Sequence, residues 1–158
     1  MELLVIRHAK AEAHGHPGGD AARALVVKGE AQAERIGRFL RRMERLPDLT
    51  LTSPLVRARQ TAERLCASAG VSSPVVQPWL AAGMDPETAG RELGAVAACD
   101  RLASVGHEPD LSALIEHLLG AAGGTIEMKK AALTGLELRG AGRRARLLFH
   151  VPPSMQGR

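Results

Sequence analysis

Short apolar runs alternate with longer amphipathic stretches along most of the 158-residue chain. The short runs have the length and the branched side chains of buried strands. Four such strands are predicted, at Glu2–Ile6, Leu49–Thr52, Val75–Gln77 and Arg101–Val105. Alternation of strands with helices is typical of a mainly parallel sheet with helices on both faces.

Apolar residues at helical spacing predict a helix after each of these strands. The helices are expected at Lys28–Arg45, from Ser53 to about Ala69, from Asp85 to about Ala98, and from Glu108 to Leu119. Ser53-Pro54 and Asp85-Pro86 each place a capping side chain before a proline at the first helical position. Gly70 and Gly120 supply stop signals at the carboxyl ends of two helices.

Two segments interrupt the alternation. Residues Ala9–Ala24 are polar, glycine-rich and without periodicity, which predicts a long loop of the kind that is usually functional or disordered. Ala131–Leu138 and Arg143–Val151 flank Gly140-Ala141-Gly142 and predict an antiparallel hairpin. We therefore expect one domain over residues 1–158, a three-layer α/β sandwich with a mainly parallel central sheet and a C-terminal antiparallel hairpin.

The net charge of +4 and the excess of arginine over lysine raise the question of nucleic-acid binding. Only 2% of the residues are aromatic, so platforms for stacking single-stranded bases are missing. Duplex binding stays open on charge alone, but arginine also suits recognition of anions in general. We expect no nucleic-acid partner.

Membrane, disulfide and metal patterns are weak. No apolar run approaches the roughly 18 residues of a membrane span, and the first strand is too short for a signal-peptide core. Cys66 and Cys99 form no paired motif. His14 and His16 have a suggestive spacing but no third ligand, so no metal is predicted. These features favour a cytoplasmic protein without a membrane partner or a cofactor.

Arginine and histidine follow three of the predicted strands. Arg7 and His8 follow the first, Arg57 opens the helix after the second, and His107 follows the fourth. Because the carboxyl ends of parallel strands lie along one edge of a sheet, these side chains are expected to converge. No cysteine or carboxylate cluster accompanies them.

Such a set suits a phosphoryl group that is bound without a metal. Guanidinium groups bind pairs of oxygens, and Arg57 lies where the amino end of a helix also favours an anion. Fixed positive charges favour a neutral imidazole, which is a nucleophile. One histidine can attack in line while the other donates to an equatorial oxygen.

Three motifs of this sequence carry a family resemblance. In chain order they are Leu4–Glu12, Thr52–Ala62 and Val105–Pro109. They resemble the signature motifs of the histidine phosphatase superfamily, the phosphoglycerate mutase-like enzymes. The short length, and Ala9 where glycine is usual, are most similar to the small SixA-type phosphohistidine phosphatases. The resemblance covers roughly residues 2 to 150.

The resemblance implies a phosphoglycerate mutase-like fold and no cofactor. It implies that His8 accepts the phosphoryl group and that Arg7, Arg57 and His107 clamp its oxygens. Residues 23–29 are similar to an Arg-Pro-Leu-Thr-x-x-Gly run of the small members, although alanine and valine replace the proline and the threonine. Arg23 is therefore expected to face the phosphate or the substrate.

A proton donor is harder to assign. Larger members carry a glutamate in the loop after the third strand, whereas here that loop, residues 79–85, holds only Asp85, which also has the position of a helix cap. Whether Asp85 acts as a general acid stays open. A missing acid favours a leaving group that departs readily, such as the protonated imidazole of phosphohistidine.

The sequence thus predicts a phosphatase that cleaves phosphomonoester or phosphoramidate bonds through a phosphohistidine at His8. The expected substrate is a phosphorylated protein, such as a phosphohistidine on a histidine-containing phosphocarrier domain. Three alternatives remain: a phosphatase of small molecules or sugar phosphates, a non-catalytic phosphate-binding module, and a nucleic-acid binder.

Overall fold

The computed structural model of the chain describes residues 1–96, 98–140 and 144–157. Its centre is a six-stranded sheet with the strand order β3-β2-β4-β1-β5-β6. The strands are β1 (Glu2–Arg7), β2 (Leu49–Thr52), β3 (Val75–Val76), β4 (Arg101–Gly106), β5 (Leu133–Arg139) and β6 (Arg144–Val151). The first four pair in parallel, whereas β5 runs antiparallel to both β1 and β6.

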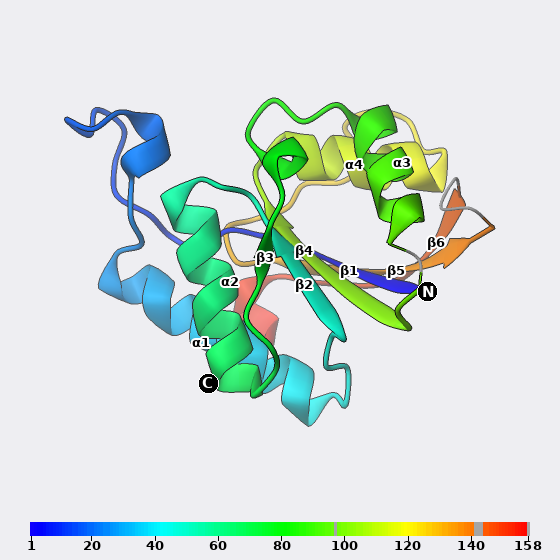
Figure 1. The fold of residues 1–158 in the computed structure, drawn as a ribbon, viewed down its shortest axis with the longest axis horizontal. Coiled ribbons are helices and arrows are strands. Elements are labelled where there is room, and N and C mark those ends of the chain that lie inside the picture. The colour runs from blue at the N-terminus through cyan, green and yellow to red at the C-terminus, as the bar shows by residue number, and fades with distance from the viewer. Residues whose placement is uncertain (97, 141–143, 158) are drawn as a thin grey trace.

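Helices cover both faces of this sheet (Figure 1). Helices α1 (Val27–Arg42) and α2 (Val56–Ala69) lie on one face, and α3 (Pro86–Ala95) and α4 (Asp110–Leu119) lie on the other. Successive residues of β1 enter two separate apolar cores, one beneath each pair of helices. The predicted three-layer α/β class with its mainly parallel sheet is confirmed.

The helices differ from the sequence prediction at their ends. Helix α1 ends at Arg42 rather than Arg45, since Glu44 has a φ of 54° that a helix cannot contain. Helix α3 ends at Ala95 rather than near Ala98. At its start Asp85 caps the helix as predicted, by accepting a hydrogen bond from the N–H of Thr88.

The predicted cap of α2 is wrong. The helix begins at Val56 with Leu55 as its capping residue, and no side chain caps it. Ser53 lies further out, where its Oγ accepts the N–H of Leu55 at 3.2 Å and also contacts His107 at 2.8 Å. The hydroxyl that the local pattern assigns to a helix cap therefore serves a contact between two distant segments.

The predicted long loop lies near the amino end of the chain, and the predicted hairpin lies near the carboxyl end. The loop contains a short 3-10 segment, η1 (Asp20–Ala22), and is closed at its base by a bridge between Ala11 and Leu25. It projects beside the amino end of α2 (the blue segment in Figure 1). Strands β5 and β6 form the predicted antiparallel pair. Residues 141 and 142 of the predicted turn and residue 143 of the predicted second strand lie outside the described residues. Two further 3-10 segments are η2 (Pro78–Leu80) and η3 (Pro153–Met155). Among the described helices, none has both the length and the apolar character needed to cross a membrane.

Gly37 allows α1 and α2 to pack closely, because a Cβ there would overlap Ser68 Oγ and the Leu65 carbonyl oxygen. We expect Gly37→Ala to lower the free energy of unfolding by about 1–3 kcal/mol through overpacking. The matched control is Gly90→Ala in α3, where the nearest atoms lie 4.0 Å away; it should raise stability by roughly 0.5–1 kcal/mol. Urea denaturation measures both, and equal effects would contradict the proposed packing.

Candidate active site

Two histidines lie side by side where β1 and β4 end. His8 follows β1 and His107 follows β4, its parallel neighbour in the sheet. The His8 N–H donates to the Gly106 carbonyl at 3.1 Å, which ties the two strand ends together. The imidazole rings are 5.2 Å apart between centroids and tilted by 53°. The structure thus brings together two of the predicted site residues.

Arg57 reaches the same place from the first turn of α2. Its Nε donates to His8 Nε2 at 3.3 Å, and the residue is only 4% exposed. Thr61, one turn further along α2, donates its hydroxyl to the Arg57 carbonyl at 2.7 Å and accepts the Ala9 N–H at 3.1 Å. Thr61 therefore fixes the segment around His8 to the helix that carries Arg57. The sequence interpretation gave Thr61 no role, although it lies within the second motif.

The hydrogen bonds of His8 decide which ring nitrogen is available. Its Nδ1 lies 2.8 Å from the Ala9 carbonyl oxygen, which can only accept, so Nδ1 carries the proton. Nε2 therefore holds the lone pair, in agreement with its acceptance of the Arg57 N–H. Nε2, the nitrogen beside Arg57, is therefore the ring atom that can act as a nucleophile.

In His107 Nε2 accepts a hydrogen bond, and Nδ1 carries the proton. Its Nε2 lies 2.8 Å from Ser53 Oγ, and that hydroxyl already accepts the Leu55 N–H. Ser53 is fully buried, and in the described part of the chain its hydroxyl has no other atom to which it can donate. Because a buried hydroxyl needs a partner for its proton, we assign Ser53 as the donor and His107 Nε2 as the acceptor. The proton of the neutral ring then sits on Nδ1, which is buried and has no partner in the described part of the chain. His107 thus offers an N–H donor.

Both imidazoles are neutral at physiological pH. Burial lowers the pKa of His8 to about 3, and the positive charges of Arg57 and Arg7 act in the same direction, against a hydrogen bond to Ala9 that raises it. Burial also lowers the pKa of His107 to about 4, again with help from Arg57. The sequence interpretation attributed the neutral form to neighbouring charge, whereas removal from water is the larger cause.

Arg7 extends from the end of β1 into the same pocket. One of its terminal nitrogens donates to the Met128 carbonyl at 2.7 Å. Its Nε is buried and, within residues 1–96, 98–140 and 144–157, has no hydrogen-bond partner. The pocket has a volume of about 330 Å³ and is lined by all five predicted site residues: Arg7, His8, Arg23, Arg57 and His107.

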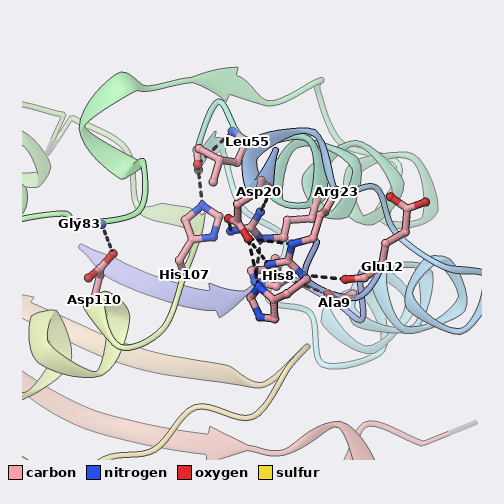
Figure 2. A network of polar contacts seen from close by, with 12 residues as sticks. His8, Ala9, Glu12, Asp20, Arg23, Leu55, Gly83, His107 and Asp110 are labelled. Atoms are coloured by element: carbon pink, nitrogen blue, oxygen red, sulfur yellow. Dashed lines mark hydrogen bonds and ion pairs between the residues drawn. The ribbon is translucent and has the colours of Figure 1, made fainter. Parts of the chain in front are cut away.

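A carboxylate, that of Asp20, joins Arg57 and Arg23, and Figure 2 shows it beside Arg23. Asp20, in η1, accepts from Arg57 at 2.9 Å with one oxygen and from Arg23 at 2.7 and 2.8 Å with the other. Arg23 also donates to the Glu12 carbonyl at 2.7 Å. Partial burial acts to raise the pKa of Asp20, but the two arginines hold it below its ordinary value. Sequence reasoning missed Asp20; its only signal is its position three residues before Arg23.

Two more charged residues line the pocket, Glu108 and Lys130. Burial lowers the pKa of Lys130, and nearby arginines add to the effect. Asp85 lies on the surface and caps α3. His14 and His16 lie near Asp20 and Glu12, at 3.4 and 3.6 Å, and the described residues contain no group of three ligands that could hold a metal.

Comparison with known proteins assigns this site to a class. The family model of the histidine phosphatase superfamily (branch 1) matches residues 3–81. An uncharacterised protein of Picosynechococcus sp. is 36% identical over 139 residues, which are 86% of this chain and 84% of that protein. The chain belongs to the histidine phosphatase superfamily, and it is thus a hydrolase, a phosphatase of the metal-independent type.

Solved structures agree with this assignment. The protein histidine phosphatase SixA in complex with tungstate has a TM-score of 0.88 at 23% identity over 98% of each chain. A candidate SixA phosphohistidine phosphatase from Agrobacterium tumefaciens has a TM-score of 0.83 at 26% identity, covering 96% of this chain and 97% of its own. A candidate α-ribazole-5'-P phosphatase from Escherichia coli reaches 0.78 at 18% identity over 98% of each chain. The fold is SixA-like, as the motifs predicted.

The lowered pKa values make stability depend on pH. Unfolded histidine binds a proton below about pH 6.5, whereas folded His8 and His107 resist protonation until about pH 3 and 4. The stability that these neutral rings contribute is complete above pH 6.5 and falls as the pH decreases, by up to about 1.4 kcal/mol per pH unit for each ring.

We therefore expect His8→Gln to lose less stability than the wild type when the pH is lowered from 7 to 5. The shift of the urea midpoint over this pH range measures the loss for each protein. The matched control is His14→Gln, at a side chain that is 88% exposed. An identical pH slope in wild type and His8→Gln would contradict a neutral buried His8.

Proposed function

We propose that this chain is a protein phosphohistidine phosphatase in which His8 carries the phosphoryl group. The main support is the pair of buried N–H donors around His8, Arg7 Nε and His107 Nδ1, which lack partners in the described residues. Buried donors without acceptors are costly, so a ligand with several oxygens fits this place. A phosphoryl group supplies three equatorial oxygens.

The reaction has two displacements at phosphorus. In the first, the lone pair of His8 Nε2 attacks, the N–P bond forms and the bond to the leaving group breaks. Arg57 exchanges its contact with Nε2 for a phosphoryl oxygen. Arg7, Arg57 and His107 bind the equatorial oxygens as charge develops on them. In the second, water attacks the same phosphorus, the N–P bond breaks, and phosphate leaves with His8 restored.

Arg23 is proposed to bind the substrate next to the phosphoryl group. Its guanidinium lines the pocket and is held in place by Asp20 and by the Glu12 carbonyl. Because Asp20 already neutralises part of its charge, Arg23 contributes orientation more than net attraction. This role extends the expectation drawn from the Arg23–Gly29 run.

The pocket is large enough for a phosphorylated side chain as substrate. A volume of about 330 Å³ lies at the lower end of the range for small-molecule sites, roughly 300–1,000 Å³. Such a pocket takes a phosphoimidazole and leaves the rest of a partner protein outside. Likeness to SixA structures named as histidine or phosphohistidine phosphatases supports a phosphohistidine as the substrate. We propose a histidine-containing phosphocarrier domain as the partner that carries it. The cytoplasmic location stays a prediction.

A covalent intermediate tests the chemistry. Incubation with radiolabelled phosphoramidate, followed by a rapid quench, is expected to give an acid-labile, alkali-stable label on His8. His8→Ala should lose the label and at least roughly 10³-fold of the turnover, because the attacking atom is gone. His117→Ala, at an exposed histidine of α4 that does not line the pocket, is the control and should keep both. Labelling that survives in His8→Ala would contradict the proposal.

Substrate choice is tested by comparing three phosphorylated compounds. We expect kcat/KM for a phosphohistidine carrier domain to exceed that for a phosphoserine peptide and for glucose 6-phosphate by more than about tenfold, or 1.4 kcal/mol in transition-state binding. Faster turnover of the sugar phosphate would instead favour the small-molecule phosphatase. Tight phosphate binding without turnover of any aryl phosphate would favour the non-catalytic module.

A further inference from the structure

One carboxylate in the pocket wall has no part in the chemistry described so far. Glu108 follows His107 directly and lines the same pocket as His8. Its side chain is half-buried. Both carboxyl oxygens lie close to Ser112 Oγ, in the first turn of α4, at 2.9 and 2.8 Å. The carboxyl group is therefore held at a defined place beside the phosphoryl clamp.

The contact with Ser112 suits a group that gains and loses a proton. A serine hydroxyl both donates and accepts. It donates to the ionised carboxylate of Glu108, and it can accept from the same group once one carboxyl oxygen is protonated. Because both oxygens lie within hydrogen-bond distance of Oγ, neither protonation state leaves the group without a partner.

The other carboxylates near this edge of the sheet already have hydrogen-bond partners that keep them from proton transfer. Asp20 lies between Arg57 and Arg23, which hold its pKa low and keep it ionised. Asp85 caps α3 and does not line the pocket. Asp110 accepts the N–H of Gly83 from the loop before α3. Among the described carboxylates, Glu108 alone combines a place in the pocket with freedom from arginine hydrogen bonds.

The surroundings of Glu108 carry mixed charge. Burial raises its pKa, and the negative charge of Asp110 adds to this, while Ser112 and the positive charge of Arg7 oppose it. The remaining titratable groups of the pocket are mostly cationic or neutral: His8, His14, Asp20, Arg23, Arg57, His107 and Lys130. A raised pKa moves a carboxyl group toward the range in which general acids and bases work at neutral pH.

We propose that Glu108 is the proton-transfer residue of this site. As the base, it takes a proton from the water whose oxygen bonds to phosphorus while the N–P bond to His8 breaks. As the acid, it gives a proton to a leaving oxygen while the P–O bond breaks and the N–P bond forms. The inference rests on the proposed intermediate at His8. It extends the substrates from phosphohistidine, whose protonated imidazole leaves unaided, to phosphate monoesters.

The decisive variant is Glu108→Gln, which keeps the shape and an acceptor for Ser112. Rapid-quench kinetics would measure formation and breakdown of the phosphoenzyme for p-nitrophenyl phosphate and phenyl phosphate. With the good leaving group, formation should stay close to wild type. With the poor one, formation should fall by about 10²-fold or more. Breakdown of the phosphoenzyme should slow for both substrates, so the phosphoenzyme accumulates. Added formate should restore the rate of breakdown in Glu108→Ala.

Two controls separate chemistry from structure. Asp85→Asn removes a carboxylate outside the pocket and should match wild type in every rate. Glu108→Asp keeps a carboxyl group and should retain part of the breakdown rate together with its dependence on pH; it also replaces the glutamine variant if that variant is unstable in a thermal melt.

The outcomes distinguish this inference from the proposed function. The role of Glu108 would be overturned if the phosphoenzyme forms on His8 but Glu108→Gln slows its formation equally for both leaving groups, or slows neither formation nor breakdown. His8 would then remain the nucleophile. Absence of any phosphoenzyme in the wild type would overturn the His8 intermediate itself, and Glu108 with it.

Discussion

The hydrogen bond from His8 Nδ1 to the Ala9 carbonyl determines the chemistry available to this site. It places the only proton of the neutral ring on the side away from the pocket and leaves the lone pair of Nε2 beside Arg57. The local backbone makes this bond dependable. Ala9 is tied to Thr61 of α2, and His8 to the end of β4, so the carbonyl and the ring cannot drift apart independently.

The second constraint is the balance of charge in a buried place. Arginine stays protonated in proteins, so any site that gathers Arg7, Arg23 and Arg57 needs an anion or neutral neighbours. Asp20 supplies one negative charge, and both imidazoles stay neutral. The result is a cationic pocket whose two neutral rings divide the work, since one offers a lone pair and the other an N–H group.

Much of this arrangement follows from local pattern, and some of it does not. The convergence of Arg7, His8, Arg57 and His107 was predictable because each follows a strand of one parallel sheet; their catalytic roles stay predictions. The role of Ser53 was misread because a serine before a proline fits a helix cap, whereas its contact with His107 spans 54 residues of sequence. Asp20 could not be found, since its loop has no periodicity to place it. Glu108 stood in the third motif, but only the structure shows that its side chain lines the pocket.

The same fold serves enzymes with different leaving groups, so the phosphoryl clamp alone does not choose the substrate. Structures named for SixA and for an α-ribazole-5'-P phosphatase both share the fold of this chain. In the proposed mechanism Arg7, Arg57 and His107 bind the transferred group, which all such substrates share. Discrimination must then arise where the leaving group sits, from the rim and from whatever supplies its proton. A proton donor on the residue that directly follows His107 would keep its place relative to the clamp. Its distance from the leaving atom would then not depend on the loops around the pocket.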